Sequence, residues 1–195
     1  MINLAVVYQE GDKKFGIKKN IKKSIELYEK AIELNDTSAM NNLGLLYEIG
    51  DKKKGIKKDI KKAINLYEKA SILKNPGAIN NLAVIFFEGN EKAGIERDIH
   101  KAISLYEKAF DYGDPNAVLN LASIFEKGSP EYGIEKNFQK SLEYYQKGIF
   151  YFFIFLFFYF FYFYFFYFYL FFFLFLFFYF FIFLFFYFYF SYFYF

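Results

Sequence analysis

One histidine and no cysteine occur in this chain of 195 residues, so the side chains that most often act as nucleophiles, bases or metal ligands are scarce. His100 stands in a column that repeats every 39 residues and elsewhere holds Lys22, Lys61 and Gln139. Because lysine and glutamine favour solvent, we expect His100 to be an exposed helix residue. Without convergent titratable groups the sequence predicts no enzyme, and we expect neither a cofactor nor a metal.

Carboxylates and glycines repeat at the same interval, in arrangements that do not suit catalysis. Glu29, Glu68 and Glu107 lie about one unit apart, which is too far for two carboxylates to share acid and base roles. The glycine pair of a unit, such as Gly50 and Gly55, lacks the Lys-Ser/Thr that completes a phosphate-binding loop. Both features therefore belong to the repeat itself.

Asparagines at three equivalent positions are better suited to binding. A carboxamide both donates and accepts hydrogen bonds, so Asn42, Asn81 and Asn120 are candidates for clamping the backbone of an extended peptide. Their identity in three units also favours a structural hydrogen bond, and both interpretations stay open.

The elements that must position these side chains come from a 39-residue repeat, which fills residues 1–148 in units of about 1–37, 38–76, 77–115 and 116–148. Such a period is typical of solenoids. In the second unit, apolar residues at helical spacing predict a first helix, helix A, from about Ser38 to a stop at Gly50. A loop then leads to Asp59, whose side chain suits the N-cap of a second helix, helix B.

The chain resembles the Sel1-like repeat, a relative of the tetratricopeptide repeat, in the pattern Asn42-Leu43-Gly44, Tyr47, Gly50, Gly55-Ile56, Asp59, Lys62-Ala63 and Leu66-Tyr67. The resemblance covers residues 1–148. It implies an all-α fold, a right-handed α/α solenoid whose concave face binds peptides or protein surfaces and which has no reaction of its own. We expect the four units to be an internal part of a longer array.

Helix A lines the concave surface of tetratricopeptide-like solenoids, so we expect its variable residues to contact a partner. Three columns at i, i+4 and i+7 share one stripe of the helix. From the second unit onward these columns hold Asn41, Leu45, Glu48, Asn80, Val84, Phe87, Leu119, Ser123 and Glu126. The alternative is that Leu45, Val84 and Phe87 pack against the next unit.

Basic charge is concentrated in the loops of the first two units. Residues 38–76 hold nine lysines and four carboxylates, whereas residues 77–115 hold four basic and seven acidic side chains. This predicts a basic ridge that could meet an acidic partner, formed by Lys52, Lys53, Lys54, Lys57 and Lys58. The ridge lacks the interleaved aromatic and arginine residues of a base-stacking platform, so we do not expect nucleic acid. A solvated loop surface is the alternative.

From residue 149 onward the chain holds only Phe, Tyr, Leu and Ile apart from Ser191. The run exceeds the roughly 20 apolar residues that span a bilayer, so a membrane segment is one interpretation of this low-complexity tail. Tyrosines scattered throughout, the lack of a turn residue and the lack of a following Lys or Arg do not fit lipid contact. The other interpretation is a gene-model artefact, because codons for all these residues can differ from TTT by one base.

These observations predict a non-catalytic scaffold for protein-protein interaction, located in the cytoplasm, which binds a protein or peptide on helix A. The alternative is a Sel1-like adaptor of the quality-control or signalling type that residues 149–195 anchor in a membrane.

Overall fold

The computed structural model describes residues 1–51 and 55–193, with side chains described up to residue 182. The described residues confirm the all-α fold class. They form α1 (Ile2–Glu10), α2 (Ile21–Ile32), α3 (Thr37–Ile49), α4 (Ile60–Ile72), α5 (Pro76–Glu88), η2 (Glu91–Ala93), α6 (Ile99–Asp111), α7 (Pro115–Lys127), η3 (Pro130–Tyr132) and α8 (Phe138–Phe193). Contacts along the chain separate two compact parts, Met1–Gly148 and Ile149–Phe195.

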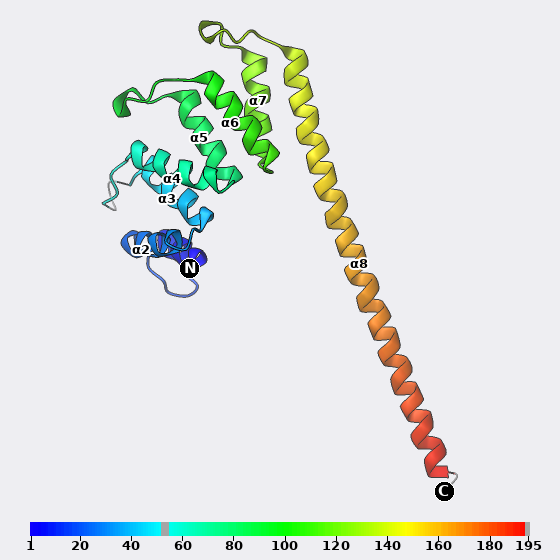
Figure 1. Cartoon of the computed structure of the whole chain (residues 1–195). Helices are drawn as coiled ribbons and strands as arrows, with labels where there is room; N and C mark the ends of the chain where they lie inside the picture. Colours follow the sequence, from blue (N-terminus) through cyan, green and yellow to red (C-terminus); the bar gives the residue numbers. More distant parts are fainter. Residues whose placement is uncertain (52–54, 194–195) are drawn as a thin grey trace. The chain divides into compact units, whose positions relative to one another are not determined.

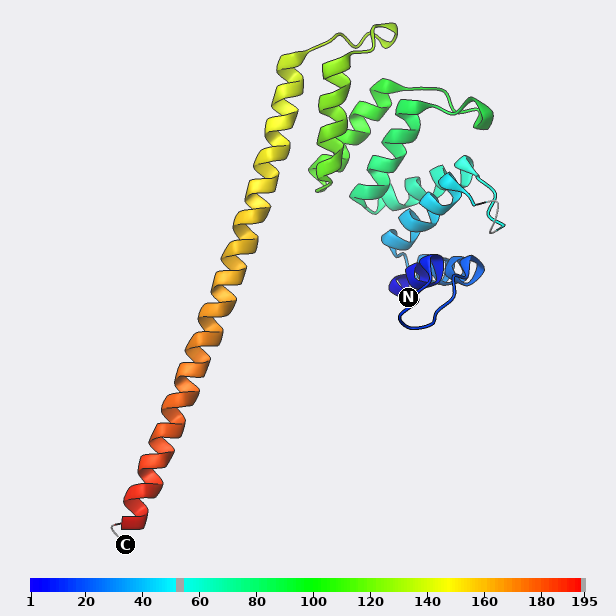
Figure 2. The same cartoon turned by 180° about the vertical axis from the view of Figure 1, so that it is seen from behind.

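The first part is a stack of helix pairs. Helix A of the four units is α1, α3, α5 and α7, and helix B is α2, α4, α6 and the first turns of α8. Figures 1 and 2 show that each pair follows the previous one along the stack and that the loops between helix A and helix B lie along one edge. The structure therefore has the repeat that the sequence predicts, and the helix A predicted from Ser38 begins one residue earlier.

Every helix B begins at a capping carboxylate or carboxamide, as predicted from Asp59. The Asp59 Oδ1 accepts the backbone N–H of Lys62 at 3.0 Å, and Asn20, Asp98 and Asn137 make the equivalent bond. The backbone N–H of Asp59 donates to the Tyr47 carbonyl at 2.8 Å, and this bond also recurs in all four units. The capping residue thus fixes the start of helix B to the last turn of helix A.

Glycine ends each helix A because the backbone there takes a conformation that side chains disfavour. Gly128 has φ 69° and ψ 175°, a region that only glycine occupies readily. A Cβ at this position would lie 2.8 Å from the backbone nitrogen of Lys136 across the loop. The loop is closed by an isolated antiparallel bridge between Ser129 and Ile134, which has a counterpart in each unit.

One tyrosine of helix B fills the centre of each of the first three units. Tyr28 and Tyr67 are fully buried, and Tyr106 is 2% exposed. Small residues of helix A make room for these rings. A Cβ on Gly44 would lie 2.6 Å from Cε1 of Tyr67, which explains the glycine in a column that otherwise holds alanine.

The turn from helix B to the next helix A needs one residue with a positive φ. Asn35, Lys74 and Gly113 hold this position in successive units, with φ of 60°, 63° and 99°. In the third and fourth units, helix A then begins with a proline in its first turn, Pro76 and Pro115 respectively. A proline is accepted there because the missing N–H would have no partner inside the helix.

The second part, from Ile149 onward, is described as one helical stretch that continues α8 to Phe193. Aromatic rings four residues apart contact each other along it, as in Phe157–Phe161 and Phe161–Phe165. Nearly all of its described side chains are exposed.

Candidate partner-binding surface

The nine predicted partner-binding residues of helix A fall into two groups in the structure. Leu45, Leu119 and Glu126 are exposed, with 39% exposure for Leu45 and 52% for Leu119. The other six are half-buried. Val84 and Phe87 pack against the core shared by the third and fourth units, so the alternative interpretation applies to them. Leu45 stays accessible.

Asparagines of neighbouring helices A are hydrogen-bonded to one another. The Asn81 Nδ2 donates to the Asn41 Oδ1 at 2.9 Å, and the Asn120 Nδ2 donates to the Asn80 Oδ1 at 3.2 Å. The repeated asparagine of one unit therefore holds the variable asparagine of the unit before it. This asparagine ladder, Asn41–Asn81 and Asn80–Asn120, is the structural hydrogen bond that was one of the two interpretations.

Acidic residues of the third helix A column accept hydrogen bonds from tyrosines of helix B. The Tyr67 hydroxyl donates to the Glu48 Oε2 at 2.7 Å, and Tyr145 donates to Glu126 at 3.1 Å. Burial, followed by the hydrogen bond and the charge of Glu48, raises the pKa of Tyr67 above its usual value. Glu48 and Glu126 thus hold helix B as well as facing the predicted groove. In the third unit Phe87 occupies this column.

A lysine in the first turn of each helix B lies over an aromatic ring of helix A. The Lys101 Nζ is 3.6 Å from the centre of the Phe86 ring and the Lys140 Nζ is 4.0 Å from that of Phe125. Lys23 over Tyr8 and Lys62 over Tyr47 repeat the contact at 4.3 and 5.1 Å. A cation over a ring face is attracted by about 0.5 to 1 kcal/mol at exposed sites. These lysines are therefore engaged within their own units.

The predicted basic ridge is described only in part. Lys57 and Lys58 are exposed beside the loop of the second unit. Lys52, Lys53 and Lys54 lie outside the described residues.

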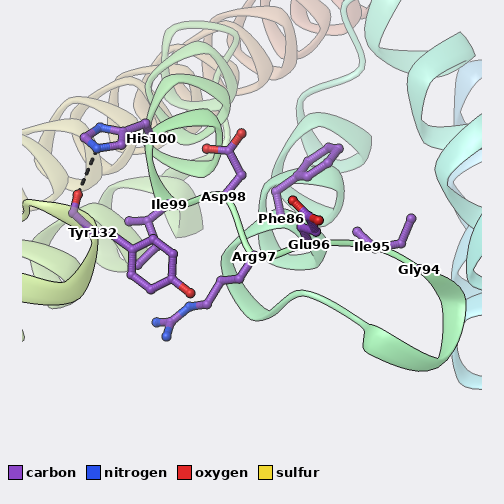
Figure 3. Close-up of a pocket in the computed structure, with 9 residues that line it drawn as sticks. All are labelled: Phe86, Gly94, Ile95, Glu96, Arg97, Asp98, Ile99, His100 and Tyr132. Atoms are coloured by element: carbon purple, nitrogen blue, oxygen red, sulfur yellow. Dashed lines mark hydrogen bonds between the residues drawn. The ribbon is translucent and has the colours of Figure 1, made fainter.

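The chain's single arginine and its single histidine both contact Tyr132 at the junction of the third and fourth units (Figure 3). Arg97 lies between two rings, with its Cζ 5.3 Å from the centre of Phe87 and 5.0 Å from that of Tyr132. Its Nε donates to the Phe87 carbonyl at 2.8 Å, and its guanidinium reaches Glu131 at 3.4 Å. The exposed His100 has its Nε2 2.9 Å from the Tyr132 carbonyl oxygen. A cavity of about 350 Å³ opens beside these side chains.

Arg97 connects the third and fourth units. It contacts the ring and the carbonyl of Phe87 in α5 of its own unit, and the Tyr132 ring and the Glu131 carboxylate in the loop of the next unit. The expectation that His100 is exposed is confirmed, and its hydrogen bond to the next loop was not foreseen. Within residues 1–51 and 55–182, no three His, Asp or Glu side chains converge in a way that could hold a metal ion.

The family model described as "Sel1 repeat" matches the sequence four times, at residues 1–36, 37–75, 76–114 and 115–149. The chain belongs to the Sel1 repeat family. Proteins built from Sel1 repeats are generally scaffolds for protein interaction and are typically non-catalytic. None of the curated proteins compared matches the chain.

Two solved structures have the same Sel1 architecture. The Sel1 repeat protein from Oxalobacter formigenes is 28% identical with a TM-score of 0.63, and the match covers 76% of this chain and 56% of that one. The protective antigen c5321 of uropathogenic Escherichia coli, which displays an SLR fold, is 24% identical with a TM-score of 0.63 and coverage of 76% and 29%. This chain therefore spans little more than half of the first protein and under a third of the second.

Two sets of contacts were not predicted from the sequence: the asparagine ladder between Sel1 units, and the lysine–aromatic contact within each unit. The asparagine ladder joins residues 40 positions apart, so the repeat period alone does not pair them. The lysine–aromatic contact does repeat at the period, in the columns of Lys62 and Tyr47. Pairing the repeated columns of helix A and helix B across the loop would have found the contact.

Proposed function

We propose that this chain is a non-catalytic, cytoplasmic scaffold whose helix A face binds an extended protein or peptide segment. The observation that carries the proposal is the exposure of Leu45 and Leu119 on α3 and α7, beside amides held in one orientation by the asparagine ladder. Exposed leucines next to fixed polar groups are the mixture expected of a peptide-binding surface.

The orientation of the asparagine amides indicates which hydrogen-bonding group the ligand would present to them. Asn41 and Asn80 accept a hydrogen bond through their Oδ1, which fixes each amide plane and directs the Nδ2 group as a donor. A peptide carbonyl is the matching acceptor. Leu45 and Leu119 would then contact apolar side chains of the same segment, while Ser123 and Glu126 supply polar contacts at the α7 end.

Selection from a displayed library of random peptides, with the full chain in detergent as bait, tests this proposal. We expect the selected peptides to bind the wild-type chain and to lose at least about tenfold in affinity, or about 1.4 kcal/mol, on Leu45→Asp and on Leu119→Asp. Ile72→Asp is the matched control, because Ile72 is 79% exposed and lies on helix B. Equal binding by all four proteins would overturn the helix A assignment.

The lysines beside the second loop are expected to select partners with acidic flanks. Lys57 and Lys58 are exposed and lie in the unit with the largest excess of basic residues. Long-range attraction between such charges acts mainly on the association rate and weakens with salt. Replacing both lysines by glutamine should therefore slow the binding of acidic peptides at low salt and leave neutral peptides unaffected, as measured by surface plasmon resonance.

A membrane-anchored scaffold is the second candidate. Phe138–Ile182 is long and apolar enough to cross a bilayer by length and composition. Residues 149–193 would extend about 70 Å as a helix, more than twice the hydrocarbon thickness of about 30 Å. If the run anchors the chain, full-length protein expressed in cells should stay in the membrane pellet after alkaline carbonate extraction, in a form that detergent solubilises. Release by carbonate alone would exclude this candidate.

A further inference from the structure

A cavity of about 500 Å³ lies where residues of α2, α3 and α4 meet, at the junction of the first two Sel1 units. Leu43 and Tyr47 of α3 and Leu66 of α4 give it an apolar lining. Glu29 and Glu33 of α2 add two exposed carboxylates. A volume of this size accommodates an aromatic side chain. We call it the Leu66 cavity.

The fourth unit shows how an aromatic ring occupies the equivalent position. Tyr144 stands two units after Leu66 in the same column and is 7% exposed. Its ring stacks on Phe125, with the ring centroids 5.7 Å apart and an interplanar angle of 13°. Its hydroxyl donates to the Oε1 of Glu107, in helix B of the preceding unit, at 2.7 Å. One phenol thus connects helix A of its own unit to helix B of the unit before it.

The residues around Tyr144 match those around the Leu66 cavity. Phe125 corresponds to Tyr47, and Glu107 corresponds to Glu29. A leucine supplies neither a ring face nor a hydroxyl, so a phenol that contacts Tyr47 and Glu29 together has to come from a partner. The same correspondence joins Leu43 with Leu121, Lys62 with Lys140, and Glu33 with Asp111.

We propose that the Leu66 cavity binds an unmodified tyrosine side chain of a partner protein. The ring lies against Tyr47, and the hydroxyl donates to the carboxylate of Glu29. Stacking of the rings and a hydrogen bond to a charged acceptor both add to the free energy gained by burying the phenol.

The charge of the cavity selects a neutral phenol over a phosphorylated one. Glu29 and Glu33 are four residues apart on α2, so they lie on the same face of the helix. A carboxylate accepts a hydrogen bond from a hydroxyl, whereas two carboxylates repel a phosphate. Lys62 also lines the cavity, but it lies over the Tyr47 ring, with its Nζ 5.1 Å from the ring centre. We therefore expect phosphorylation of the ligand tyrosine to prevent binding.

This site is separate from the helix A surface proposed above, because Leu45 and Leu119 lie outside the cavity. A ligand of helix A that has no tyrosine is not expected to enter the cavity. The two proposals can therefore fail independently.

Saturation-transfer NMR with the full chain in detergent tests the cavity. The probe is a short peptide with one tyrosine between glycine and serine residues, and its affinity is obtained by titration. We expect Leu66→Tyr to weaken binding by at least about tenfold, because the new side chain fills the cavity as Tyr144 does in the fourth unit. Ile72→Tyr is the matched control and should bind as the wild type does, because it adds the same ring to α4 at a residue that is 79% exposed.

The hydrogen bond to Glu29 has its own test. Glu29→Gln should weaken binding by about fivefold, because a neutral acceptor replaces a charged one. Glu68→Gln, at the equivalent exposed residue of the next unit, should leave the affinity unchanged. A probe with phenylalanine in place of tyrosine should also bind more weakly, and a phosphotyrosine probe should not bind. Circular dichroism checks the fold of each variant, and the exposed Glu29 keeps the test decisive if Leu66→Tyr does not fold.

Four results would overturn the proposal. The tyrosine probe could fail to bind the wild type, or it could bind Leu66→Tyr as strongly as the wild type, which would place the tyrosine elsewhere. Equal affinity for the tyrosine and phenylalanine probes would show that the hydroxyl is not recognised. Tighter binding of the phosphotyrosine probe, or of a probe with lysine in place of tyrosine, would assign the cavity to an anion or to a cation.

Discussion

The buried Tyr28 and Tyr67 join the two helices of their units by both the ring and the hydroxyl group. The Tyr67 ring lies against Gly44, and its hydroxyl donates to Glu48 on the same helix A. The hydrogen bond to a charged acceptor has a larger effect than one between neutral groups, about 1.5 to 3 kcal/mol. Because Glu48 is only half-buried and can be hydrated when the bond is lost, we expect the lower end of that range.

Replacing Tyr67 by phenylalanine should lower the free energy of unfolding by about 1.5 kcal/mol at neutral pH, as measured by urea denaturation. The pKa of Tyr67 is raised in the folded state from the usual 10.0. The folded protein therefore keeps a proton that the unfolded chain loses, so stability that is present below about pH 10 falls as the pH rises further. The Tyr67→Phe variant should show a shallower fall above pH 10 than the wild type.

The exposed Tyr112 provides the control for this measurement. Because Tyr112 is 39% exposed, Tyr112→Phe should change the stability by less than about 0.5 kcal/mol. If Tyr67→Phe matched Tyr112→Phe in both stability and alkaline slope, the hydrogen bond to Glu48 would not contribute to folding.

At the scale of the elements, the turn from helix B to the next helix A places a lysine in a left-handed backbone conformation, which is unfavourable for a residue with a side chain. Lys74 has φ 63°, in the column where Gly113 stands one unit later. A left-handed backbone costs a side-chain-bearing residue about 1 to 2 kcal/mol, and glycine avoids this at an entropic cost of about 0.5 to 1 kcal/mol.

Lys74→Gly should therefore stabilise the array by about 0.5 kcal/mol in urea denaturation. Lys69→Gly serves as the control, because Lys69 lies inside α4, where glycine should cost about 1 kcal/mol. Destabilisation by both substitutions would contradict the account of this turn.

The glycine that ends helix A is required for two reasons, positive φ and close approach, whereas the next glycine of the loop is required for φ alone. Gly128 lies where a Cβ would meet the Lys136 backbone at 2.8 Å, and Gly133 has no atom within 4 Å of the equivalent Cβ position. We expect Gly128→Ala to cost about 3 kcal/mol and Gly133→Ala about 1 kcal/mol, as measured by thermal unfolding. Equal costs would mean that the loop moves away from Gly128 freely.

The sequence was sufficient for the elements whose signals are local. The helix start at Asp59 and the helix stop at Gly50 follow from capping and backbone chemistry within a few residues, and the structure has them at those places. The positive φ of Lys74 could not be predicted, because a lysine gives no sign of it until it is aligned with Gly113. Contacts across units, such as Asn81 with Asn41 and Arg97 with Tyr132, depend on how one helix pair turns relative to the next.

In the array of residues 1–148, helix B and helix A have different roles. Helix B supplies the tyrosine and lysine columns that hold each pair together, as Tyr67 and Lys62 do in the second unit. Helix A keeps its variable residues partly accessible, with Leu45 and Leu119 the most exposed apolar ones among those predicted to bind. A partner should therefore meet helix A, and changes of partner need not disturb the core.

Hydrogen–deuterium exchange of the full chain, with and without a selected peptide, shows directly which helices a ligand contacts. We predict slower exchange on binding in α3, α5 and α7, which carry Leu45, the asparagine ladder and Leu119, and no change in α4 and α6. Slower exchange in α4 and α6 alone, with α3, α5 and α7 unchanged, would contradict this prediction and place the binding surface on helix B.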